Sequence, residues 1–180
     1  MRLDSARAPG FRKFWTLVFA MILAGLPAGT AMAEDADTIS GTAEVIDADI
    51  LKFGNQRVIL WGIDAPERRQ TCVMNNEVWG CYEVSRRYLE LLAGRGEVTC
   101  KLLGDPDPFG RRFGTCESGG EDLNAQMVKA GLALAFDEET DMYDVDMADA
   151  ITAGVGLWQP GVIFEEPWVF RRRETPGGYR

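Results

Sequence analysis

The sequence predicts an α+β domain built from short strands and a few amphipathic helices. Short runs rich in β-branched and aliphatic residues alternate with turn signals between residues 39 and 61, and again between 97 and 117. Apolar residues recur at helical spacing between residues 84 and 92 and again in the last third of the chain. These patterns give about five strands, with one helix after the third strand and two helices at the end.

The first three strands are expected to form a meander. The turn signals Asp47-Ala48-Asp49 and Gly54-Asn55 separate them, and strands joined by tight turns pair antiparallel. The segment Asp64-Ala65-Pro66-Glu67 then ends the sheet, because a proline cannot donate a ladder hydrogen bond. The three strands are expected at residues 39–46, 50–53 and 57–61.

The first helix follows an irregular polar stretch at residues 68–80. Its apolar face is formed by Val84, Tyr88, Leu91 and Leu92, and Gly94 suits its C′ position.

The rest of the domain contains two strands and two helices. A polar loop rich in proline and glycine, at residues 104–112, separates the two strands. The strands are expected at residues 97–103 and 113–117, and the helices at 123–130 and 142–153. Residues 173–180 are expected to be a disordered tail.

The first 33 residues have the pattern of a secretory signal peptide. An apolar run from Phe14 to Ala24 is followed by the A-x-A cleavage site Ala31-Met32-Ala33. The run is shorter than the roughly 20 residues that cross a bilayer, so we interpret it as a cleaved signal rather than a membrane anchor. The domain is therefore expected to occupy residues 34–172 of a secreted or periplasmic protein. The positive charges before the run are Arg2, Arg7, Arg12 and Lys13.

Removal of this segment makes the chain strongly acidic. The whole chain has a net charge of −9, and its first 33 residues contain four basic side chains and one acidic, which leaves −12 for the remainder. Proteins that bind nucleic acids usually have a basic surface, because phosphate contacts and counterion release supply much of the affinity. Any polyanion site must therefore be a local basic patch or be made attractive by a bound cation.

Four cysteines permit three disulfide pairings. An even number in an exported chain favours disulfides. Cys100 and Cys116 lie on the two expected strands that flank one loop, and Cys72 and Cys81 flank the segment before the first helix. We therefore favour the pairs 72–81 and 100–116 over a redox pair. A zinc site and catalysis by Ser-His-Asp or Cys-His are disfavoured, because the chain has no histidine and no C-x-x-C.

Seven short motifs lie in order along residues 39–172. They are the Asp-x-Asp turn at 47–49, Gly62-Ile63-Asp64-Ala65-Pro66-Glu67, Asp107-Pro108-Phe109-Gly110-Arg111, Asp122-Leu123-Asn124, Gly131-Leu132-Ala133, Gly156-Leu157-Trp158 and Pro167-Trp168-Val169-Phe170-Arg171. As an ordered set they resemble the staphylococcal nuclease (thermonuclease) family. The resemblance implies a five-stranded OB-type β-barrel with three helices, and calcium-dependent cleavage of DNA or RNA phosphodiesters.

The resemblance also implies roles for individual residues. Asp49 and Asp64 match the two metal-binding aspartates, and Ala65 stands where a backbone carbonyl completes the coordination. Glu67 matches the general base that activates water, and Arg111 matches one of two arginines that clamp the phosphate. Oxygen ligands of this kind suit calcium, and metal and arginine charges stabilise a phosphorane.

The second catalytic arginine of the family is missing. Its position, five residues before Asp64, is held by Ile59. Arg57 lies two residues earlier on the same face of the strand and would have to reach about 7 Å further to replace it; a solvated hairpin charge is the alternative. Two smaller departures are Ile50 in place of a threonine and Phe109, an aromatic without a hydroxyl.

Three functions are compatible with these observations. The first is a secreted, monomeric, calcium-dependent nuclease for single-stranded DNA or RNA, impaired by Ile59, because arginines that stabilise a transferring phosphoryl group contribute about 10³- to 10⁵-fold in rate. The alternative is a non-catalytic pseudonuclease that serves as an extracytoplasmic interaction module. A third reading is an accessory protein of envelope or polysaccharide assembly. The basic run Arg171-Arg172-Arg173 is interpreted as a solvated terminus.

Overall fold

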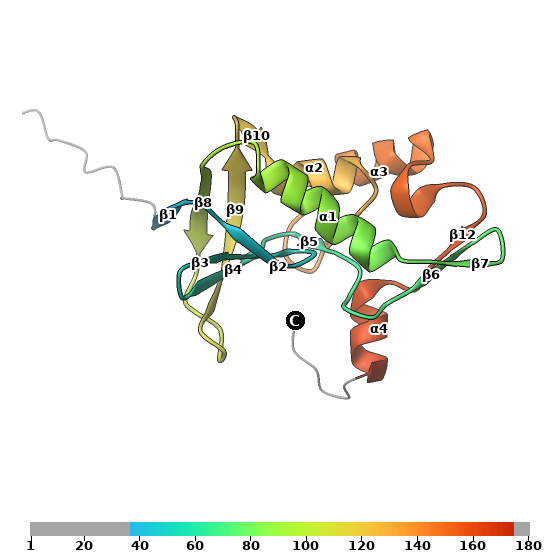
Figure 1. Ribbon diagram of the computed structural model, residues 1–180, viewed down its shortest axis with the longest axis horizontal. Helices are drawn as coiled ribbons and strands as arrows, with labels where there is room; N and C mark the ends of the chain where they lie inside the picture. The colour runs from blue at the N-terminus through green and yellow to red at the C-terminus, as the bar shows by residue number, and fades with distance from the viewer. Residues whose placement is uncertain (1–36, 175–180) are drawn as a thin grey trace, which may run out of the picture. The chain divides into compact units, whose positions relative to one another are not determined.

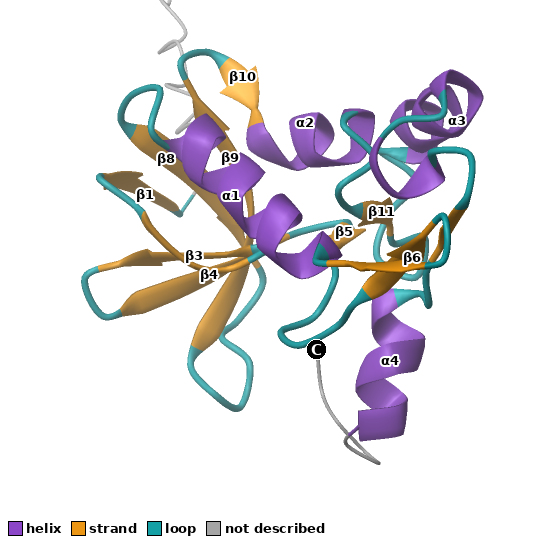
Figure 2. Cartoon of the chain, turned by 45° about the vertical axis from the view of Figure 1, so that its right-hand side comes forward, coloured by secondary structure: helices purple, strands orange, loops and turns teal. Residues whose placement is uncertain are grey.

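The computed structural model describes residues 37–174, and the predicted α+β class is confirmed. A curled, half-barrel sheet is covered by helices (Figures 1 and 2). The predicted signal peptide and residues 175–180 of the predicted tail lie outside the described residues. Within residues 37–174 no helix has the length and apolar character needed to cross a membrane.

The main sheet has the strand order β1-β8-β9-β4-β3-β2, with β10 paired to β9. All neighbours are antiparallel except β4 and β9, which run parallel, and β2, β3 and β4 form the predicted meander. Its strands are β1 Thr38–Gly41, β2 Glu44–Asp47, β3 Ile50–Phe53, β4 Gln56–Leu60, β8 Val98–Leu103, β9 Arg111–Ser118 and β10 Glu121–Asp122.

The single strand predicted at residues 39–46 is two strands. β1 pairs with β8, whereas β2 pairs with β3 at the opposite end of the strand order. The chain leaves the extended ladder at residues 42–43, directly after Gly41 with its φ of +148°, and passes from one edge of the curled sheet to the other. A local sequence pattern contains no information on this change of partner.

The three predicted helices are present and a fourth follows them. They are α1 Cys81–Ala93, α2 Leu123–Lys129 and α3 Asp144–Ala153, with a 3₁₀ turn at Gly156–Trp158. The fourth, α4 Pro167–Glu174, was not predicted from the sequence, and it contains two residues that were assigned to the tail. It begins with a proline, which suits the first turn of a helix, but it is too short to show an amphipathic stripe.

Residues 68–80 are not irregular as expected. They contain the hairpin of β6 Cys72–Met74 and β7 Glu77–Trp79, whose turn residues Asn75 and Asn76 both have positive φ. Asparagine tolerates this left-handed conformation, which two-residue hairpin turns require. β12 Val162–Ile163 pairs with β6, and the short strands β5 Ile63–Asp64 and β11 Leu134–Ala135 pair with each other.

The main core lies between the sheet and helices α1 and α2. Figure 2 shows α1 lying across the sheet, and its buried Leu89 and Leu92 pack in one cluster with Leu51, Val58 and residues of α2. A smaller cluster surrounds the Cys72–Cys81 disulfide and includes Leu157. This second cluster connects the β6–β7 hairpin to the C-terminal part of the chain.

Both predicted disulfides are confirmed. Cys72 is bonded to Cys81, and Cys100 is bonded to Cys116 directly opposite it on β8 and β9. All four cysteines are buried. The layout of the strands was enough to predict the pairs, because each joins neighbours at the two ends of one short connection.

Replacing both Cys100 and Cys116 with alanine is expected to lower the free energy of unfolding by about 3 kcal/mol, because their bridge closes a loop of 16 residues in the unfolded chain. The matched variant lacking Cys72 and Cys81 is expected to lose slightly less unfolding free energy, about 2.5 kcal/mol, because these two cysteines are separated by only 9 residues in the sequence. Urea denaturation under oxidising conditions measures both losses. A greater loss from the 72–81 pair would contradict this order.

Candidate active site

Most of the residues to which the resemblance assigns roles line one small cavity. It has a volume of about 110 Å³ and lies where the β2–β3 turn, β4, the loop after β5 and the helix α4 meet. Three of its lining residues are carboxylates and two are arginines. It is lined by Asp47, Asp49, Ile50, Ile59, Glu67, Arg111 and Arg171.

The backbone brings Asp49 and the Asp64–Ala65 segment together. The amide of Leu60 donates a hydrogen bond of 2.9 Å to the carbonyl of Asp49, which fixes the β2–β3 turn against the end of β4. The amide of Ala65 lies 3.5 Å from Oδ2 of Asp49. Asp64 itself is on β5 and is fully buried. The backbone therefore places Asp49 beside the Asp64–Ala65 segment.

Gly62 allows the chain to turn from β4 into β5. Its φ is +75°, and a Cβ atom there would lie 2.4 Å from the side chain of Thr140. Its amide donates to Glu139 Oε2 at 2.8 Å. Only glycine combines this left-handed backbone with such close packing, and the turn sets the position of Asp64 two residues later.

Glu67 is held in a closed turn beside the cavity. Its amide donates to Oε1 of Gln70 at 2.9 Å, and the amide of Gln70 donates back to the carbonyl of Glu67 at 2.7 Å. Burial raises the pKa of Glu67 above its ordinary value, although the nearby charge and hydrogen bond of Arg171 lower it in part. A carboxylate with a raised pKa is better matched to accept a proton near neutral pH.

Arg111 is oriented by the loop that precedes it. Oδ2 of Asp107 accepts from Nε of Arg111 at 2.6 Å, and Oδ1 of Asp107 accepts from the amides of Phe109 and Arg111. Burial alone would raise the pKa of Asp107, but these hydrogen bonds outweigh it and lower the pKa. The carboxylate is therefore ionised and holds the guanidinium beside the cavity.

Arg171 is the site residue that sequence reasoning missed. Its Nη2 lies 2.8 Å from Oδ2 of Asp64, its Nη1 lies 3.3 Å from Oδ1, and Nη1 also forms an ion pair with Oε1 of Glu67. Burial alone would lower the pKa of Arg171, but the two carboxylates raise it, so the side chain stays charged. The sequence drew attention to this segment only through the motif Pro167–Arg171, which is one of those that resemble the family. No feature of the sequence linked Arg171 to Asp64.

Ile59 and Arg57 lie in different environments. Ile59 is buried and lines the cavity at the position where the family resemblance would place an arginine. Arg57 is exposed, lies opposite Lys52 and Arg111 in the sheet register, and is not among the residues that line the cavity. The structure therefore brings Arg171, rather than Arg57, to this cavity.

The residues do not fit a calcium ion as they are arranged. Asp49, Asp64 and the carbonyl of Ala65 are oxygen donors of the right kind for calcium. However, the guanidinium of Arg171 contacts both carboxylate oxygens of Asp64. Within residues 37–174, no group of three or more His, Cys, Asp or Glu side chains is arranged to hold a metal ion.

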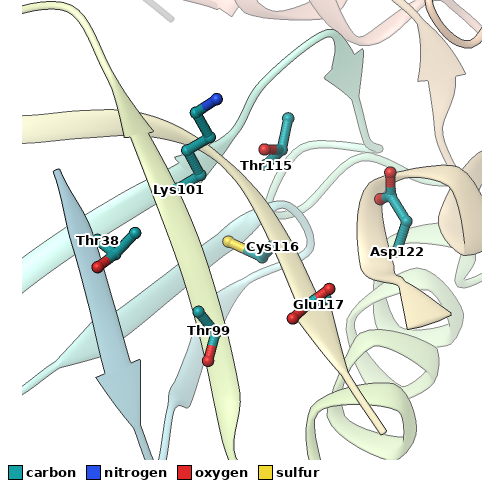
Figure 3. A pocket seen from close by; sticks show the side chains of 7 residues that line it. All are labelled: Thr38, Thr99, Lys101, Thr115, Cys116, Glu117 and Asp122. Atoms are coloured by element: carbon teal, nitrogen blue, oxygen red, sulfur yellow. The ribbon is translucent and has the colours of Figure 1, made fainter. Parts of the chain in front are cut away.

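A second hollow lies on the face of β8 and β9 that points away from the main core. It has a volume of about 310 Å³. Figure 3 shows that its side chains are three hydroxyls, two carboxylates, one lysine and one cysteine (Thr38, Thr99, Lys101, Thr115, Cys116, Glu117 and Asp122). It contains no arginine and none of the residues predicted to act on a phosphodiester, so the smaller cavity is the candidate active site.

The chain matches a known protein family. Residues 57–160, more than half of the chain, match the family model described as "Staphylococcal nuclease homologue". The chain belongs to the staphylococcal nuclease family. Asp64, Ala65, Glu67 and Arg111 fall inside the matched range, whereas Asp49 and Arg171 fall outside it.

The chain is also similar to a curated protein of Rhizobium meliloti (strain 1021) named "Succinoglycan biosynthesis protein ExoI". The two are 32% identical over 130 residues, which cover 69% of this chain. The chain spans 66% of the length of that relative.

Replacing Arg171 with methionine is expected to lower the free energy of unfolding by about 3 to 5 kcal/mol, because it removes the guanidinium partner of a fully buried carboxylate. The additional change Asp64→Asn should recover part of that loss. Arg173→Met on the same helix changes an exposed pair with Glu165 and should stay within about 0.5 kcal/mol of wild type. Chemical denaturation measures all four proteins; equal losses from both arginines would contradict this account.

Glu67→Gln is expected to raise the melting temperature at pH 7. A raised pKa means that the folded state disfavours ionised Glu67, so the charge reduces stability at pH values above the folded-state pKa. The gain should shrink as the pH falls and vanish below 4.5, the ordinary value of the group. Calorimetry from pH 4 to 8 measures it, with the exposed Glu77→Gln as the control. A lower melting temperature at pH 7 would show that the Arg171 pair outweighs burial.

Proposed function

We propose that this protein is a nuclease-like phosphodiesterase that acts outside the cytoplasm. The observation that supports it most is the meeting of Glu67 with two guanidinium groups, those of Arg111 and Arg171, around one cavity. Family membership supports the reaction class, and the two disulfides support an oxidising compartment. We propose that residues 1–33 are removed on export and that the domain covers residues 34–172.

The proposed reaction is the attack of water on a phosphodiester. Glu67 accepts a proton from the water molecule while the oxygen of that water bonds to phosphorus. The P–O bond to the leaving alcohol breaks, and solvent protonates the alcohol. Arg111 and Arg171 stabilise the negative charge that develops on the phosphoryl oxygens. Asp107 orients Arg111, and Asp64 orients Arg171.

The calcium dependence implied by the family would require Arg171 to leave Asp64. No step of the proposed reaction therefore depends on a metal ion. The substrate class that we propose is single-stranded DNA or RNA, bound by a monomer. Because the chain without its first 33 residues carries a net charge of −12, we expect weak binding that depends on this local pair of arginines.

The disulfide-bonded protein is expected to cleave fluorogenic single-stranded DNA or RNA slowly. Glu67→Gln should reduce the rate about 10²- to 10⁴-fold, the usual contribution of a general base. Glu77→Gln, the same chemical change at an exposed position of β7, should leave the rate unchanged. Each protein is assayed with calcium and with a chelator. Absence of cleavage by wild type in both conditions, together with none after Ile59→Arg, would rule out the enzyme.

A second candidate function is an accessory role in polysaccharide assembly without catalysis. The name of the Rhizobium meliloti relative supports it, as do the buried Ile59 and the acidic composition. It predicts a folded protein with no cleavage in the assay above. A non-catalytic interaction module would give the same result in this assay and would differ only in the partner that it binds.

A further inference from the structure

The guanidinium of Arg171 makes three contacts to two carboxylates. Two go to the separate oxygens of Asp64, at 2.8 and 3.3 Å, and the third is the ion pair with Glu67. A guanidinium is planar and matches both oxygens of one carboxylate, which gives directional as well as electrostatic attraction. The contacts are therefore those of a specific cation site and not of a loose surface pair.

The helix that supplies this cation is fixed to the site at several points. Nε2 of Gln70 donates to the carbonyl of Glu165 at 2.6 Å, while the same glutamine closes the turn of Glu67. The ring of Trp168 lies 5.4 Å from that of Phe136. Figure 1 shows α4 well below α2 and α3, next to β6. Its position makes the Arg171 side chain, which is 14% exposed, part of the folded core of the site.

The charges around Arg171 explain why a cation is needed there. Asp64 is fully buried, and Asp47, Asp49 and Glu67 line the adjoining cavity. A buried carboxylate is strongly destabilising unless it is paired. Arg111, the other cation at the cavity, is bound to Asp107. A divalent ion would have to use the same oxygens of Asp64 that Arg171 contacts, and it would be repelled by the guanidinium at that distance.

We propose that Arg171 is an internal cation that takes the place of a divalent metal ion in this domain, so that the protein does not bind calcium at Asp49 and Asp64 while α4 is in place. This goes beyond the proposed function, because it concerns the occupant of the site and holds whether or not the protein cleaves a phosphodiester. It also assigns α4, which lies outside the range matched by the family model, a defined role.

Calcium binding to the disulfide-bonded protein tests this proposal. Wild type and R173M, the control on the same helix, are expected to show no heat of calcium binding by isothermal titration calorimetry. R171M is expected to bind calcium in the range of about 10⁻⁴ to 10⁻³ M, as extracellular calcium sites do. Calcium should also raise the melting temperature of R171M, but not that of wild type or R173M. The added change D64N should remove that binding.

Three results would overturn the proposal. The first is that wild type binds calcium with an affinity within about threefold of that of R171M and that D64N abolishes this binding. The second is that R171M is folded but binds no calcium. If R171M is unfolded in buffer, its refolding is followed against calcium concentration. Refolding that depends on calcium concentration supports the proposal. Refolding that is independent of calcium, or no refolding at any calcium concentration, is the third result that would overturn it.

Discussion

The arrangement of the site depends on the ion pair between Asp64 and Arg171. Asp64 is fully buried at the start of the loop that also carries Glu67, and its charge requires a partner inside the protein. That partner comes from α4, more than 100 residues later in the chain. Because the same guanidinium reaches Glu67, one interaction fixes the loop, the last helix and the charge balance of the cavity.

The strand register and the C-terminal segment together make this contact possible. The antiparallel register of β3 against β4 places the β2–β3 turn beside the end of β4, where Asp49 and Ile59 meet the Asp64 loop. The smaller core around the Cys72–Cys81 disulfide then holds the C-terminal part against the β6–β7 hairpin. The disulfide therefore stabilises the approach of α4 to the cavity as well as the hairpin itself.

Much of the site could be predicted from the sequence because it is encoded in short segments. Asp49 lies in the β2–β3 turn of the meander, and Asp64 and Glu67 follow within a few residues of the end of β4, so that local turns bring the three segments together. Both disulfides join the two ends of a single short connection, which the order of elements already indicated. The fold class followed from the same local signals.

Arg171 and α4 could not be predicted in this way. Three consecutive arginines near the end of a chain have the composition of a solvated terminus, and only the tertiary contact to Asp64 distinguishes the first of them. Arg57 was the substitute suggested by strand periodicity, but its side chain is exposed and does not line the cavity. The division of the first strand was missed for a related reason, since pairing with two distant partners is a property of the folded sheet.

A crystal structure of the protein grown with a high concentration of calcium shows directly which cation Asp64 binds. We expect the guanidinium of Arg171 to contact both oxygens of Asp64, and we expect no ion to be bound between Asp49 and Asp64. A calcium ion coordinated by Asp49, Asp64 and the carbonyl of Ala65, with Arg171 displaced from the site, would contradict this expectation.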